Sequence, residues 1–92
     1  MTHLGFVAGS GIAHVGEQKY SVSYRIDVFE GLGGLKSGSG SLEGEPVHLI
    51  EIIKARGSDL ELETGHKVRI VVRHVEGGNA EFLVSGPVPG FT

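Results

Sequence analysis

The sequence predicts an all-β protein, a small antiparallel β-barrel or β-sandwich of six to seven strands joined largely by up-and-down hairpins. Three observations lead to this prediction. First, one long segment alternates between apolar and polar residues. Second, two neighbouring segments can pair in a single register that matches apolar residues on one face and opposite charges on the other. Third, 16 glycines without a triplet period separate the alternating runs. With 92 residues, the chain has room for a single soluble domain, residues 1–92, and a small core.

The clearest predicted strand covers residues 19–29. Its odd positions are polar, and its even positions are apolar or aromatic, namely Tyr20, Val22, Tyr24, Ile26 and Val28. A period of two with β-branched and aromatic residues is typical of a half-buried strand. Residues 6–15 are expected to form the preceding strand, with Gly16 and Glu17 beginning the turn between the two.

Residues 58–75 contain the most strongly specified hairpin. A three-residue loop at 63–65, with Gly65 in the left-handed position of a bulge, pairs Leu60 with Val68 on one face. The same register pairs Asp59 with Arg69 and Glu61 with Lys67 on the other face. A slip of one residue would destroy both the apolar face and the charge pairing, so this register is the one we predict.

A second three-residue loop, at 76–78, predicts the register of the last hairpin, which pairs His74 with Ala80, Val72 with Phe82 and Arg73 with Glu81. This register also places Val71 beside Leu83 on the outer face, with Val75 further along. We therefore predict an apolar stripe of Val71, Val75 and Leu83 on the outer side of the sheet. The stripe is the candidate protein interface.

Two segments allow alternatives. By composition, residues 35–44 suit a flexible linker, but their alternating glycines and serines favour a thin strand, because linkers deep inside small domains are uncommon. Residues 47–56 are rich in β-branched residues, which favours a strand. However, Pro46, Lys54 and Gly57 also fit a short helix over residues 47–55, and such a helix would cover the outer stripe. Of the two, we favour the strand.

Composition argues against several classes of partner. The net charge is −3, and the eight lysines and arginines are scattered, so no basic face for nucleic acid is expected. No apolar run approaches the ~20 residues that span a bilayer, so we expect no membrane partner. Cysteine is absent and the first residues do not resemble a signal peptide, so we expect a cytoplasmic location.

The residue types that commonly carry chemistry are placed here in patterns that favour structural roles. Five histidines are present, but none has the short spacing of a metal site, and His66 and His74 would lie about 26 Å apart along one strand. The Gly-Ser-Gly segments at 9–11 and 38–40 complete neither a nucleophile elbow nor a dinucleotide loop. We therefore predict no catalytic residue, no cofactor and no metal.

Three functional hypotheses remain. The favoured one is a non-catalytic protein-interaction module that forms a homodimer, or binds another protein, through the outer stripe. The alternative is a small-molecule-binding barrel whose candidate lining residues are Tyr20, Tyr24 and Phe82. Barrels of fewer than about eight strands are usually filled by their own side chains, which weighs against a ligand inside. An enzyme is the least favoured, because no set of nucleophile, base and orienting group is visible.

Overall fold

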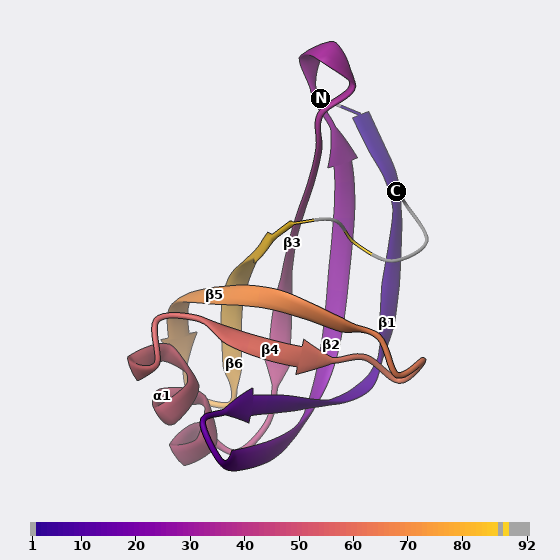
Figure 1. Cartoon of the computed structure of the whole chain (residues 1–92). Coiled ribbons are helices and arrows are strands. Elements are labelled where there is room, and N and C mark those ends of the chain that lie inside the picture. The colour runs from indigo at the N-terminus through magenta and orange to yellow at the C-terminus, as the bar shows by residue number, and fades with distance from the viewer. Residues whose placement is uncertain (1, 87, 89–92) are drawn as a thin grey trace.

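In the part of the chain that the structure describes, the protein forms a closed barrel of six antiparallel strands with one short α-helix, which confirms the all-β prediction (Figure 1). The computed structural model describes residues 2–86 and residue 88. The elements are, in chain order, β1 (Thr2–Val15), β2 (Gln18–Glu30), the 3-10 turn η1 (Leu32–Gly34), β3 (Lys36–Glu43), α1 (Pro46–Lys54), β4 (Ser58–Glu61), β5 (Lys67–Glu76) and β6 (Asn79–Ser85).

The strands follow the order β1-β2-β3-β6-β5-β4 around the barrel. Hairpins join β1 to β2, β2 to β3, β4 to β5 and β5 to β6, as the sequence predicts. The connection from β3 to β4 differs, because α1 carries the chain across the barrel, so that β3 pairs with β6 and β4 pairs with β1. In Figure 1, the upper parts of β1, β2 and β3 extend beyond the barrel as an arm that has η1 at its tip, whereas α1 lies at the opposite end.

The core has the predicted parity in β2. Val22, Tyr24, Ile26 and Val28 are buried, and Tyr20 is half-buried against the core. Burial of large apolar side chains is the main stabilising contribution in a domain of this size. The largest fully enclosed side chains come from nearly every element of the fold, namely Phe82, Ile26, Leu42, Leu49, Ile52, Leu60, Ile70 and Val28.

The hairpin of β4 and β5 has the predicted register. Ser58 pairs with Ile70, Leu60 with Val68, and the two charged pairs Asp59–Arg69 and Glu61–Lys67 lie between and beside them. The N–H of Leu62 donates to the carbonyl of His66 at 2.7 Å, which closes the loop at 63–65. Gly65 has a φ of 93°, the left-handed conformation expected for it.

The register predicted for the last hairpin is correct at one end and wrong at the other. Val72 pairs with Phe82 as predicted, but His74 pairs with Glu81, and Val75 pairs with Ala80. The connection is a two-residue turn at Gly77 and Gly78 rather than a three-residue loop. The two-residue turn and the pairing of the apolar residues require registers that differ by one residue. A bulge at Arg73 adds that one residue to β5, so both can form.

Residues 46–54 are helical, so the strand that we favoured for 47–56 is wrong and the alternative helix is correct. Pro46 occupies the first turn of α1 and Lys54 the last, where each is favourable. Leu49 and Ile52 are fully buried, and Ile53 packs against the same core. Spacings of three and four residues suit a helix, so packing outweighs the strand preference of isoleucine.

The thin strand predicted over 35–44 is present as β3, and its glycines have a packing role. Gly38 and Gly40 alternate with serines, and a Cβ on Gly40 would overlap the carbonyl group of Arg25 and touch the ring of Phe82. Strand β3 can therefore lie close to β2 while Phe82 fills the space behind it. Only glycine permits this approach.

Replacement of Gly40 by alanine tests this packing. We expect Gly40→Ala to lower the free energy of unfolding by about 1–3 kcal/mol or more, because the added methyl group must displace backbone as well as the Phe82 ring. The neighbouring Ser39→Ala, on the outer side of β3, should change it by less than about 0.5 kcal/mol. Urea unfolding of both variants provides the measurement. Equal effects would contradict the account.

Candidate functional site

The outer face of the sheet has one row of side chains that crosses five strands. The registers place Phe6 opposite Asp27, Asp27 opposite Ser39, Ser39 opposite Leu83, and Leu83 opposite Val71. We call these five residues the outer row. Phe6 and Leu83 expose 53% and 45% of their surface, and they stand about 14 Å apart across three strand spacings. Between them, the side chains are small or polar.

A groove of about 490 Å³ follows the middle of this face. Its floor is formed by Ser39, Gly40 and Ser41 of β3, whose short side chains leave the surface low. We call it the outer groove, and its lining is Asp27, Ser39, Gly40, Ser41, Arg73, Glu81, Phe82 and Leu83. One wall therefore has Asp27, and the other has Arg73, Glu81 and Leu83. Apolar and charged groups of both signs meet in one concave surface.

A cluster of charged and aromatic groups borders the groove on β1 and β2. The guanidinium carbon of Arg25 lies 4.3 Å from the centre of the Phe6 ring, a cation–π contact. Arg25 donates hydrogen bonds to both oxygens of Asp27, from Nη2 at 3.2 Å and Nε at 3.4 Å. Nε2 of His3 lies 3.0 Å from the same carboxylate, and its ring packs against Phe29. These contacts hold the Asp27 carboxylate and the Phe6 ring in place.

The Arg25 hydrogen bonds lower the pKa of Asp27 below its ordinary value, and the hydrogen bond from His3 acts in the same direction. Partial burial opposes them by raising the pKa. At pH values above about 3.9, the pKa of Asp in an unfolded chain, the ionised Asp27 therefore stabilises the folded state. This stabilisation is lost as the pH falls through the lowered pKa that Asp27 has in the folded protein.

Titration of Asp27 by NMR checks this assignment. The carboxyl carbon of Asp27 should titrate below the range of unfolded peptides, and Arg25→Gln should raise its pKa by more than His3→Gln does, because Arg25 supplies the larger stabilisation of the charge. If His3→Gln raised the pKa of Asp27 by more than Arg25→Gln, the larger contribution would belong to His3 and the assignment would be wrong.

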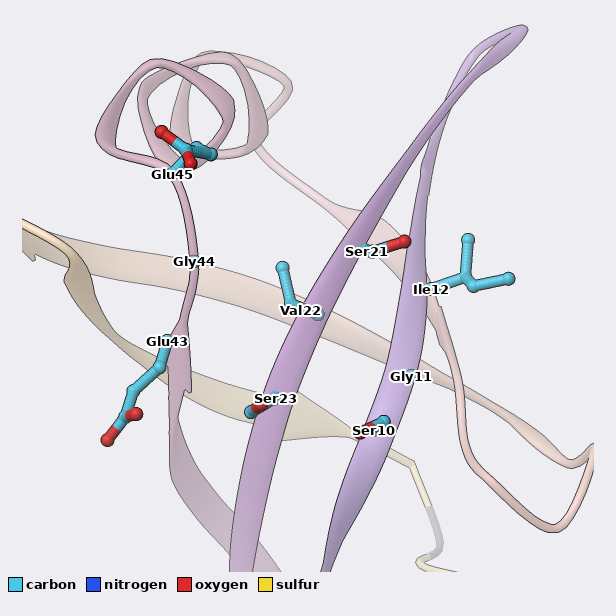
Figure 2. A pocket seen from close by; sticks show the side chains of 9 residues that line it. All are labelled: Ser10, Gly11, Ile12, Ser21, Val22, Ser23, Glu43, Gly44 and Glu45. Carbon is cyan, nitrogen blue, oxygen red and sulfur yellow. The ribbon is translucent and has the colours of Figure 1, made fainter.

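A second depression, of about 540 Å³, lies beside this face where β1 and β2 approach the end of β3 (Figure 2). Serine hydroxyls from both strands and two carboxylates line it, and its residues are Ser10, Gly11, Ile12, Ser21, Val22, Ser23, Glu43, Gly44 and Glu45. Figure 2 shows the Glu43 side chain pointing away from the serines. A serine nucleophile requires a base within hydrogen-bonding reach, and no histidine is among these lining residues. The depression therefore presents serine hydroxyls and carboxylates that can form hydrogen bonds.

The predicted interface stripe is only partly brought together. Val71 and Leu83 form the expected cross-strand pair, with Leu83 exposed and Val71 half-buried. Val75 does not join them, because the bulge at Arg73 turns it towards the core, against which it packs. Sequence reasoning missed Phe6 as the other apolar end of the outer row. The signal was its alternation with the inward-facing Val7, but glycines in the neighbouring inward positions obscure that pattern.

The candidate ligand-lining residues occupy three different environments. Phe82 is 2% exposed and packed within the barrel, and it also contributes to the lining of the outer groove. The Tyr20 ring lies 4.7 Å from the His48 ring of α1. Tyr24 lines a pocket that opens to solvent between β1 and the β4–β5 turn, where its hydroxyl accepts a hydrogen bond from the Glu63 N–H at 3.0 Å.

The histidines are dispersed over the molecule. His14 lies at the barrel seam, with Nε2 2.9 Å from Glu61, while His74 lies 3.6 Å from Glu76 on the outside. His74 was expected on the inner face, and the bulge at Arg73 reverses it. Within residues 2–86 and 88, no three His, Asp or Glu side chains gather as a metal site would require. The one α-helix in that part of the chain is too short to cross a bilayer.

Comparison of the chain with family models, with curated proteins and with solved structures found no match.

Proposed function

We propose that the protein is a non-catalytic protein-interaction module that self-associates through the outer face of its sheet. The observation that supports this proposal is the symmetry of the four outer-row residues from β1 to β6 about the line between β2 and β3. From β1 to β6, its side chains run apolar, polar, polar, apolar, as Phe6, Asp27, Ser39 and Leu83. A surface that reads the same in both directions is what an isologous two-fold interface requires.

The row suggests how two copies would meet. A two-fold axis that runs along the strands between β2 and β3 would place Phe6 of one copy against Leu83 of the second. The same axis would set the Asp27 carboxylate against the Ser39 hydroxyl, an acceptor against a donor. The low floor of the outer groove lets the two faces approach, since Ser39, Gly40 and Ser41 have little bulk. Apolar ends with a polar middle reverse the apolar centre and polar rim of most interfaces, so the association is expected to be weak.

The charges of this face also suit an identical partner. Arg25 and Asp27 lie on one side of the axis, and Arg73 and Glu81 lie on the other. Each side therefore has one acid and one base, so that a second copy meets no uncompensated charge. A small core gives the association a further advantage, because a chain of 92 residues buries a limited fraction of its surface.

The alternative, a ligand held inside the barrel, has less support. Ile26 and Ile70 are fully enclosed and Phe82 nearly so, and six strands leave little space beyond such side chains. If the experiment below shows a monomer, the binding of a different protein to the same outer face is the interpretation that is left. A cytoplasmic location stays a prediction of the sequence.

Sedimentation equilibrium tests the proposal with a matched pair of variants. Wild-type protein should have about twice the chain mass of 9.7 kDa, and Leu83→Glu should raise the dimer Kd at least about 30-fold, because it buries a charge at the apolar contact. Ile50→Glu is the control, since Ile50 is equally exposed, at 44% against 45%, but lies on α1. A monomeric wild type at high concentration, or equal losses in both variants, would exclude self-association through this face.

A further inference from the structure

Strand β1 loses its second neighbour over most of its length. It pairs with β2 from Thr2 to Val15, but it pairs with β4 only at Ile12, Ala13 and His14. Among the residues that the structure describes, no strand is paired with residues 2–11 on the side opposite β2. A sheet edge of this kind presents a row of backbone donors and acceptors that can accept another strand.

The sequence of this edge lacks the usual protection. Charged residues and prolines normally keep a free edge from pairing, and residues 2–11 contain no Asp, Glu, Lys, Arg or Pro. The one protective feature is a bulge between His3 and Gly5, near the end of the arm. From Gly5 to Ala8 the register with β2 is regular and the opposite side borders a pocket, so this part of the edge is free to pair. Further along, Gly9 and Gly11 lie close to Glu63 and Glu61.

A pocket of about 490 Å³ lies in the place that an added strand would occupy. It separates Phe6, Val7 and Ala8 of the free edge from the turn between β4 and β5, at the point where β4 leaves β1. A strand added to β1 would therefore continue the line of β4 and cover this pocket. Its walls are Phe6, Val7, Ala8, Tyr24, Leu62, Glu63, Thr64 and His66.

The charge of the pocket selects the side chain that enters it. Glu63 is the only carboxylate in the lining, and no lysine or arginine accompanies it. Its Oε2 and the Tyr24 hydroxyl both lie about 3 Å from the point where a Cβ on Gly9 would stand, at 3.0 Å and 3.1 Å. A Cβ at Gly9 would crowd both oxygens, so the two oxygens lie close to one another against the Gly9 backbone. Two acceptors above an apolar wall suit an ammonium group on a long aliphatic stem.

We propose that the free edge of β1 binds an extended segment of a partner protein as an added strand, with a lysine side chain directed to Glu63 and Tyr24. Backbone hydrogen bonds to β1 supply affinity, and the pocket supplies specificity at one position of the segment. This partner goes beyond the self-association proposed above, because it uses the edge of the sheet and not its outer face.

The test uses a capped seven-residue peptide of alternating threonine and valine with a central lysine. In an NMR titration of the full chain, we expect shifts of backbone amides in residues 5–11 and 63–66. Methylation of alternate peptide nitrogens should raise the Kd at least about tenfold, because it removes the donors that pair with β1. This comparison uses wild-type protein, so it does not depend on the folding of a variant.

A pair of charge variants tests the lysine contact. Glu63→Gln should raise the peptide Kd about tenfold at low salt, whereas Glu17→Gln, which changes the net charge equally but lies on the β1–β2 turn, should leave it unchanged. Replacement of the peptide lysine by norleucine should remove the difference between wild type and Glu63→Gln. The Leu83→Glu variant should bind the peptide like wild type, so that failure here and failure of the outer-face dimer are separate results.

Four outcomes would overturn the proposal. The first is that the methylated peptide binds as tightly as the unmethylated one, and the second is that Glu63→Gln and Glu17→Gln change the peptide Kd equally. The third is that the peptide binds only after residues 89–92 are deleted. The fourth is that it binds only when the protein is dilute enough for a dimer to dissociate. The third would assign the edge to the tail of this chain. The fourth would assign it to a second copy.

Discussion

Closure of the barrel depends on a short contact between its first and fourth strands. Only Ile12, Ala13 and His14 of β1 pair with β4, yet this contact joins the two ends of a six-stranded sheet. Ala13 and Leu60 meet there and are fully buried, and His14 reinforces the seam through its 2.9 Å contact with Glu61. Because a closed barrel requires its strands to be staggered, the partners separate again within a few residues.

The arm and the free edge follow from this brief closure. Beyond the seam, β1, β2 and β3 continue as a three-stranded sheet that the barrel does not enclose (Figure 1). Phe6, Asp27 and Ser39 of the outer row lie on these three strands, and the pocket beside Phe6 borders β1. Backbone geometry, rather than any single reactive residue, places both candidate sites on the same strands.

Local patterns predicted the strands and much of their pairing. Alternation in β2 and the coupled apolar and charged pairs of the β4–β5 hairpin were sufficient, because each constrains both faces of a sheet at once. The helix was mistaken for a strand, since isoleucine favours strands where packing does not decide. Phe6 was missed because glycines replace the apolar partners that would mark its strand as alternating.

What the sequence by itself determined was the parity of side chains, and therefore which residues of β2, β4 and the first half of β5 are buried. That information is local, because neighbouring residues of a strand must point to opposite faces. Tertiary structure alone decided the bulge at Arg73, which removed Val75 from the predicted interface, and the order of strands that brings Ser39 beside Leu83. Both depend on contacts between segments far apart in the chain, where closure of the barrel and the fit of the Phe82 ring outweigh local preference.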